Sequence, residues 1–173
     1  STAAGYYEVY VNGKRVSDRI MDPGQTDFDK RILYNTDEIS GLILQGDNTL
    51  AVHLGSGWYD ENIAFSRWKN PDGSKDKPSK TLSYGQPKFI AQLELTYDDG
   101  STQLVTSNEQ WLSHPSAVIK EGIFSGELFD ANKHNYVWNQ NVATEADKKS
   151  LANWQPAQAL QQWPCVMQGL PRK

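Results

Sequence analysis

The residues of this chain best suited to chemistry fall in one short cluster. Its members are Trp58, Tyr59, Asp60, Glu61 and Asn62, with Arg67 and Trp68 a few positions later. A sugar presents an apolar face of C–H groups and a rim of hydroxyl groups. Tryptophan and tyrosine rings pack against such a face, while carboxylate, amide and guanidinium groups hydrogen-bond such a rim. Residues 58–62, here called the Trp58 loop, therefore predict a carbohydrate-binding site.

Two carboxylates of the Trp58 loop, Asp60 and Glu61, also supply the hard oxygen ligands that calcium prefers. We expect no required cofactor, and calcium is the ion that this loop could hold. A structural interpretation competes with binding: Trp58 and Tyr59 would pack the core, and residues 60–62 would form a polar turn. We favour the structural interpretation, because buried tryptophan is ordinary in β-sandwiches.

A second pair of carboxylates, Glu127 and Asp130, lies three positions apart. A glycosidase needs two carboxyl groups, one as the acid and the other as a base or nucleophile. This spacing alone does not define such a pair. A structural role, in which the carboxylates accept hydrogen bonds from backbone or arginine N–H groups, is the favoured interpretation.

Other residue types that often carry chemistry lack the spacing it requires. The three histidines stand far apart in the sequence and form no zinc-binding pattern. The single Cys165 has no recognisable nucleophile pattern and cannot form an internal disulfide. Residues 55–57 are too few, and lack the lysine, for a phosphate-binding loop. We therefore expect no zinc, nucleotide or nucleophilic-hydrolase site.

Composition argues against two classes of partner. The 173 residues carry a formal net charge of -4, and no basic run is longer than two residues. Nucleic acid is a poor partner for such a chain, because phosphate binding needs clustered lysine and arginine. No apolar stretch approaches the length of a membrane span, so we expect no membrane partner.

The segments that position the Trp58 loop have sequence patterns that predict β-strands. Residues 6–11 alternate with a period of two, which indicates a strand with one buried face. Asn12-Gly13 suits a tight hairpin turn because both residues tolerate positive φ. A second β run over 49–54 ends at the Gly55-Ser56-Gly57 break. The Trp58 loop is therefore expected at a strand end, where sandwiches usually place their sites.

The later part of the chain continues this pattern. Residues 87–97 predict a central strand, buried through Phe89, Leu93 and Leu95. Further expected elements are a helical turn at 40–44, strands at 31–36, 102–106 and 119–129, a solvated loop at 69–80 and a short helix at 144–151. Many short strands without a repeat predict an all-β, jelly-roll-like sandwich of the galactose-binding type.

Several stretches in order resemble the N-terminal domain of bacterial α-L-rhamnosidases. They are GYYEVYVNGKRVSDRIMDPGQTDFDKRILYNTDEI, GDNTLAVHLGSGWY, GQPKFIAQLELTYDDGS and NEQWLSHPSAVIKEGIFSGELFDAN, followed by Trp138. The resemblance runs from Gly5 to Trp138. The sequence departs from the family pattern at Gln25, Phe28 and Asn132, and residues 69–83 resemble a local extension.

The resemblance implies one accessory domain over residues 1–173, with 139–173 as a tail beyond the resembling part. It implies a piece of a longer bacterial enzyme, periplasmic or secreted, that hydrolyses terminal α-L-rhamnosyl linkages by inversion. The catalytic acids of such enzymes lie on a separate helical barrel, so this chain is expected to be non-catalytic and to pack on that barrel. Glu127 and Asp130 are the candidates for the contact. Some relatives of this domain bind L-rhamnose with calcium.

Two alternatives stay open. The chain could be a stand-alone carbohydrate-binding module for L-rhamnose or another sugar, with or without calcium. It could also belong to a glycosidase with another substrate, because one fold hosts many functions. A structural role predicts that the Trp58 loop is buried. A binding role predicts an open groove in which a ring and polar groups converge.

Overall fold

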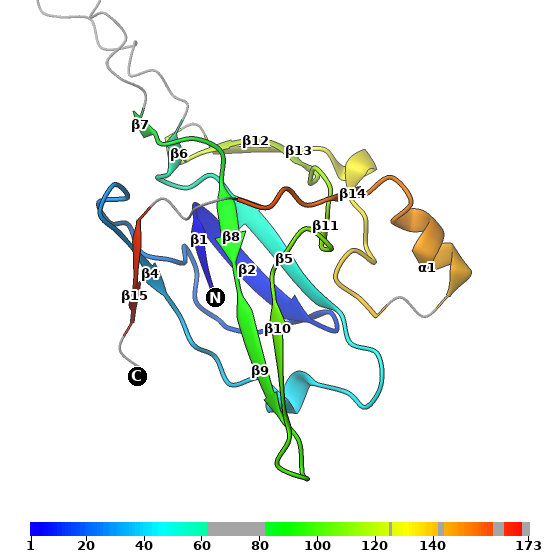
Figure 1. Ribbon diagram of the computed structural model, residues 1–173. Helices are drawn as coiled ribbons and strands as arrows, with labels where there is room; N and C mark the ends of the chain where they lie inside the picture. The colour runs from blue at the N-terminus through cyan, green and yellow to red at the C-terminus, as the bar shows by residue number, and fades with distance from the viewer. Residues whose placement is uncertain (62–81, 125, 142–143, 161–164, 171–173) are drawn as a thin grey trace, which may run out of the picture.

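Almost all of the regular structure is β (Figure 1). The computed structural model describes residues 1–61, 82–124, 126–141, 144–160 and 165–170. The strands are β1 (Thr2–Ala4), β2 (Tyr6–Val11), β3 (Lys14–Arg15), β4 (Arg31–Tyr34), β5 (Leu50–Gly55), β6 (Asp60–Glu61), β7 (Leu82–Ser83), β8 (Lys88–Ile90), β9 (Gln92–Thr96), β10 (Thr102–Thr106), β11 (Leu112–Ser113), β12 (Val118–Gly122), β13 (Gly126–Phe129), β14 (Gln155–Pro156) and β15 (Val166–Gly169). The helices are η1 (Ser40–Leu42), η2 (Ala131–Lys133) and α1 (Glu145–Ser150). In the ranges described, none of these helices has the length and apolar content needed to cross a membrane.

The centre of the fold is the antiparallel sheet β3-β2-β5. β2 and β5 pair from Tyr6↔Gly55 to Val11↔Leu50. The turn between β2 and β3 holds Asn12 at φ 50° and Gly13 at φ 79°, the left-handed conformation that a tight hairpin turn requires. The predicted strand and turn are therefore confirmed.

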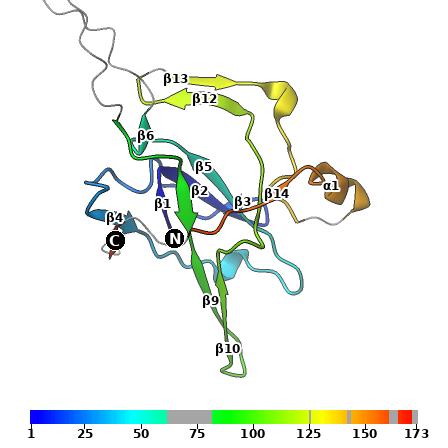
Figure 2. The same ribbon diagram turned by 45° about the horizontal axis from the view of Figure 1, so that its top comes forward.

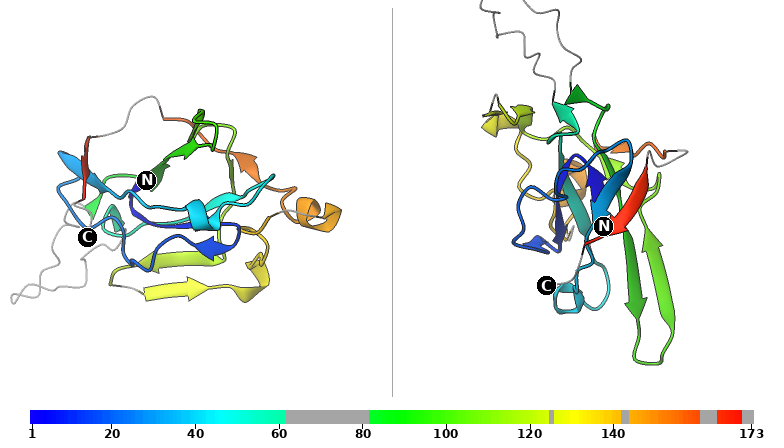
Figure 3. Two further views of the ribbon diagram at one scale, coloured as in Figure 1. Left: turned by 90° about the horizontal axis from the view of Figure 1, so that it is seen from below. Right: turned by 90° about the vertical axis from the view of Figure 1, so that its left-hand side faces the viewer.

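Two other groups of strands flank this sheet on opposite sides. Both views of Figure 3 place β8, β9 and β10 on one side and the β12–β13 hairpin on the other. β9 pairs only with β10, and β12 only with β13, among the described strands. The molecule is therefore a β-sandwich whose outer layers are separate hairpins. The all-β sandwich prediction is confirmed, and its galactose-binding subtype stays a prediction.

The core lies beside the Trp58 loop. It is a cluster of fully buried side chains with Trp58 and Cys165 packed against it, and its members are Ala4, Phe28, Ile32 and Tyr59. The Phe28 and Tyr59 rings meet edge-to-face, with their centroids 5.3 Å apart. β15 extends this region by pairing in parallel with β4, from Val166↔Arg31 to Gly169↔Tyr34. Residues 166–169, in the tail beyond residue 138, therefore pair with a strand of the N-terminal part of the chain.

Two predicted strands differ from the observed ones. The strand predicted over 87–97 breaks at Ala91, whose N–H donates to the Ser107 hydroxyl at 3.1 Å. Its residues Phe89, Leu93 and Leu95 are only half-buried, so the prediction of a buried central strand is wrong. The reason is that β9 and β10 form a hairpin reaching beyond the central sheet (Figure 1). The strand predicted over 119–129 is in fact the β12–β13 hairpin. The loop predicted at 69–80 lies outside the described residues.

The predicted helices are close to the observed ones. The helical turn at 40–44 is the 3₁₀-helix η1, and the helix at 144–151 is α1. The hydroxyl of Thr144 accepts from the Asp147 N–H, and the Asp147 carboxylate accepts from the Thr144 N–H. This reciprocal cap satisfies two backbone donors that the first turn leaves without helical partners.

Candidate functional site

The Trp58 loop begins with a turn that only glycine allows. Gly57 has φ 52°, and a Cβ atom built there would lie 2.9 Å from the Tyr6 ring. Burial raises the pKa of the Tyr6 phenol above its ordinary value. The N–H groups of Tyr59 and Asp60 both donate to the Ser56 carbonyl, at 3.2 and 3.3 Å. This turn directs the chain from the end of β5 back over the core.

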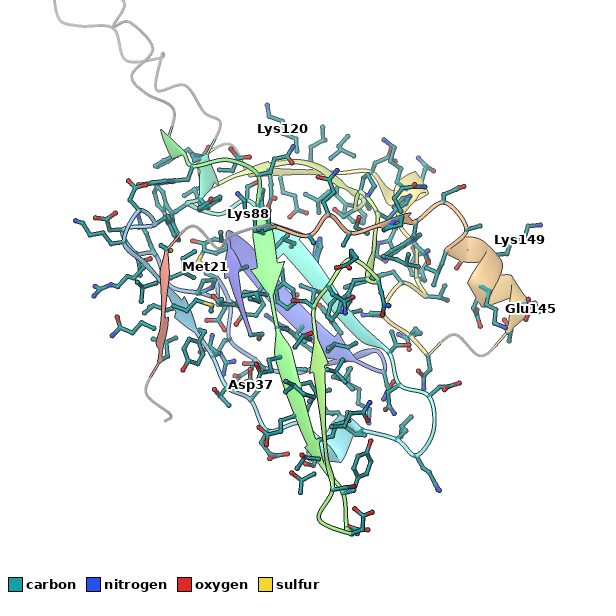
Figure 4. All side chains as sticks on the ribbon, in the orientation of Figure 1. Met21, Asp37, Lys88, Lys120, Glu145 and Lys149 are labelled. Carbon is teal, nitrogen blue, oxygen red and sulfur yellow. The ribbon has the colours of Figure 1, made fainter. Side chains whose placement is uncertain are left out.

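Tyr59 faces inward. Its side chain is 2% exposed and stacks on Tyr84, with centroids 5.6 Å apart and planes inclined by 24°. The Lys88 ammonium donates to the Tyr59 hydroxyl at 3.1 Å; Lys88, at the start of β8, is labelled in Figure 4. Phe28 occupies a further side of the ring. The Tyr59 ring therefore belongs to the core and presents no free face to a sugar in this conformation.

Trp58 is half-buried and meets a residue of the flanking hairpin. Its ring contacts Phe124 edge-to-face, with centroids 5.5 Å apart and planes inclined by 81°. Phe124 follows β12 and is itself 57% exposed. Of the two aromatic residues in the Trp58 loop, Trp58 is therefore the one that could stack on a ligand.

The two carboxylates of the loop lie on β6, which pairs with β7 through Asp60↔Ser83 and Glu61↔Leu82. Successive side chains of a strand point to opposite faces. Glu61 is 1% exposed and accepts the Ile123 N–H at 2.6 Å, while Asp60 is half-exposed. The two side chains therefore do not converge on one ion. Within the described residues, no group of three or more His, Cys, Asp or Glu could hold a metal.

A second carboxylate completes a reciprocal contact between residues 56–61 and the β12–β13 hairpin. Glu121 on β12 accepts the Ser56 N–H at 2.7 Å. Each side of the contact thus supplies a carboxylate to a backbone donor of the other. β6 lies beside the turn of the hairpin in Figures 1 and 2. We call this pair of hydrogen bonds, from Ile123 to Glu61 and from Ser56 to Glu121, the carboxylate clamp.

The remaining candidate residues are placed as follows. Asn62, Arg67 and Trp68 lie outside the described residues. Asp130 caps η2, because its Oδ1 accepts from the Asn132 backbone N–H at 3.1 Å. Glu127 is exposed and pairs with Glu121 on the neighbouring strand. The structural role expected for Asp130 agrees with this geometry, and the site predictions otherwise stay predictions.

Sequence reasoning missed the carboxylate clamp. Its partners are far apart in sequence: Glu61 and Ile123 are 62 positions apart, and Ser56 and Glu121 are 65 apart. No local motif marks a glutamate that accepts a backbone N–H from a distant hairpin. The one available signal was that Glu61 lies two positions after the buried Tyr59, on the same face of an alternating segment.

Comparisons with known proteins agree with the resemblance found in the sequence. The sequence profile described as the α-L-rhamnosidase N-terminal domain matches residues 1–166. An α-L-rhamnosidase from Formosa agariphila is 34% identical over 128 residues, which are 73% of this chain and 13% of that protein. An α-L-rhamnosidase from Alteromonas sp. is 36% identical over 140 residues, 80% of this chain and 14% of that protein.

Solved structures match the fold over nearly its whole length. The structure of an α-L-rhamnosidase from Dictyoglumus thermophilum superposes with a TM-score of 0.78 and 29% identity, covering 99% of this chain and 16% of that one. This chain thus spans less than a fifth of the solved relative and about an eighth of the Formosa protein.

Proposed function

Since this chain belongs to the α-L-rhamnosidase N-terminal domain family, we propose that it is a non-catalytic domain of an enzyme that hydrolyses terminal α-L-rhamnosyl linkages. Its role there is to support the catalytic helical barrel of the same polypeptide. The observation that carries this proposal is the coverage: matched relatives are α-L-rhamnosidases, of which the chain covers 12–15%. From the family resemblance in the sequence, we also propose that this enzyme is periplasmic or secreted.

The geometry of the carboxylates supports a non-catalytic role. An inverting glycosidase needs an acid and a base that flank the scissile bond about 6.5–9.5 Å apart, with room for a water molecule. Glu61 is buried against the Ile123 N–H, and Asp130 caps η2. Both groups are therefore engaged in holding the fold.

The test compares the full-length enzyme with the 173-residue chain on an aryl α-L-rhamnoside. We expect turnover by the full-length enzyme and none above the buffer blank by the chain alone. Aryl glycosides of other sugars serve as controls, because preferred turnover of one of them would transfer the proposal to a different substrate. Turnover by the chain alone that Glu127→Gln abolishes would overturn the non-catalytic assignment.

Carbohydrate binding is the second candidate function, favoured by the half-exposed ring of Trp58 and the half-exposed carboxylate of Asp60 at a strand end. A related structure, from Streptomyces avermitilis, is an α-L-rhamnosidase complexed with L-rhamnose. It superposes with a TM-score of 0.74 at 28% identity, over 92% of this chain and 14% of that one. We propose that Trp58 packs on the sugar, that Asp60 accepts from its hydroxyls, and that calcium, where bound, is held through Asp60.

The binding test is an NMR titration of L-rhamnose, first with calcium and then with a chelator. We expect weak affinity, about millimolar to tens of micromolar, because a monosaccharide offers few atoms and its hydroxyls must leave water. Trp58→Ala should remove the shifts, and the matched control Trp154→Ala, at another half-buried tryptophan, should keep them. If no resonance of the Trp58 loop moves under either condition, the domain has the structural role alone.

A further inference from the structure

The side chains of the β12–β13 hairpin point to two sides, one toward the central sheet and one away from it. Glu121 pairs with Glu127, and Glu121 points inward to the Ser56 N–H. Leu128 pairs with Lys120, one position along, and therefore points to the opposite side. Lys120 extends away from the body of the molecule in Figure 4. The hairpin thus turns a carboxylate inward and a leucine outward.

A bulge adds a second apolar residue to the outward side. The register shifts between Val118 and Lys120, so Ile119 and Lys120 together oppose Leu128. Ile119 is 49% exposed, Leu128 is 55% exposed, and Phe124 at the turn is 57% exposed. A sheet with one solvated face normally hides its apolar side and shows its polar side to water. This hairpin shows Ile119 and Leu128 to water on its outward side, while Val118 and Phe129 lie beside Glu121 and Glu127 on its inward side.

The carboxylate clamp explains why the hairpin keeps this orientation. Both backbone donors, Ser56 N–H and Ile123 N–H, are satisfied by carboxylates, and hydrogen bonds to charged groups are stronger than neutral ones. Rotating the hairpin to bury Leu128 would break the bond that Glu121 accepts. The outward apolar residues are therefore held in place by the clamp.

We propose that Ile119 and Leu128, on the outward side of the β12–β13 hairpin, form a docking surface for another domain of the same enzyme chain. This inference rests on the proposed function, and it names the surface through which the domain is attached. Lys120 lies between the apolar residues, so the matching surface should be apolar with one carboxylate placed to meet its ammonium group. A buried lysine needs such a partner.

The small size of the surface favours a tethered partner over a second copy. A stable interface between separate proteins buries about 800 Å² on each partner, and two apolar side chains cannot supply that area. A domain tethered in the same polypeptide reaches effective concentrations on the order of millimolar, so a small contact is enough. The length of the relatives, of which this chain covers 12–15%, leaves room for such a domain.

Hydroxyl-radical footprinting of the full-length enzyme tests this proposal directly. Leu104 on β10 is an internal control, because it is also a strand leucine and is 56% exposed. Its cross-strand partner is Glu94, and its neighbours on that face are polar. We expect Leu128 to be oxidised several-fold more slowly than Leu104. Equal rates, or faster oxidation of Leu128, would overturn the docking surface.

A pair of matched variants separates the proposal from its alternatives. In the full-length enzyme, Leu128→Asp should raise the oxidation of Ile119 several-fold, while Leu104→Asp should leave it unchanged. If diluting the full-length enzyme removes the protection of Leu128 from oxidation, the surface is covered by a second copy of the enzyme. That result would overturn the proposal of a tethered domain. Hydrolysis of the aryl α-L-rhamnoside is scored separately, so that loss of the docking surface and loss of the proposed function are distinguishable.

Discussion

The β9–β10 and β12–β13 hairpins flank the central sheet on opposite sides and distribute their polar and apolar side chains differently. On β9 and β10, the inward side holds Leu93, Leu95 and Val105, all half-buried. The other side is polar apart from Leu104. On β12 and β13, the inward side holds Glu121 and Glu127 together with Val118 and Phe129, and the outward side holds Ile119 and Leu128.

The difference shows that two kinds of interaction attach a hairpin to this sheet: apolar burial, and hydrogen bonds to carboxylates. β9–β10 follows the usual alternation, in which apolar area removed from water provides the attachment. β12–β13 is attached through the carboxylate clamp and the Trp58–Phe124 contact. Attachment through the clamp leaves Ile119 and Leu128 half-exposed on the outward side. This makes β12–β13 the better candidate for contact with another domain.

The largest expected effect comes from removing the buried half of the clamp. Glu61→Ala should lower the free energy of unfolding by about 2–3 kcal/mol, because it removes the acceptor of the partly buried Ile123 N–H and empties the position of a fully buried side chain. Glu61→Gln is the matched control and should cost less, since its amide oxygen can still accept. Urea denaturation measures both. Equal stability of wild type and Glu61→Ala would mean that the clamp does not hold the hairpin.

The corresponding change on the other hairpin should be smaller. Leu93→Ala should cost about 1–2 kcal/mol, below the usual range for a fully buried leucine, because Leu93 is only half-buried. Thermal unfolding followed by circular dichroism measures it. A loss as large as that of Glu61→Ala would show that apolar burial holds β9–β10 as strongly as the clamp holds β12–β13.

The smallest effect is expected at the exposed half of the clamp. Glu121→Ala should cost about 0.5–1.5 kcal/mol, the net value of one hydrogen bond near the surface. Glu94→Ala, on the exposed face of β9, is the control and should change stability by less than about 0.5 kcal/mol. If the two variants are equally stable, the Ser56–Glu121 bond contributes nothing to the difference between the hairpins.

Local patterns predicted the parts of the fold that depend on neighbouring residues. Alternation over residues 6–11 and the positive φ tolerated by Asn12-Gly13 are properties of a few consecutive residues, and β2 with its turn follows them. The break at Ala91 depends on a bond to Ser107, and the pairing of β15 with β4 joins residues 166–169 to residues 31–34. Neither contact leaves a local signal.

The same distinction applies to the candidate site. Residue types alone indicated a sugar-binding loop, but consecutive residues of a strand or turn point in different directions. The structure turns Tyr59 and Glu61 inward and leaves Trp58 and Asp60 half-exposed. That division depends on Tyr84, Lys88 and the β12–β13 hairpin, which lie far along the chain and could not be assigned to this loop from the sequence.

The central claim is that this domain supports an enzyme without supplying its chemistry. The most direct measurement is kcat/KM of the full-length enzyme on an aryl α-L-rhamnoside, for wild type and Glu127→Gln. Glu127 is the carboxylate of this chain best placed by spacing to pair with Asp130 as an acid or base. We predict that kcat/KM is unchanged. A loss of about 10²–10⁴-fold, as expected when a general acid or base is removed, would contradict the account.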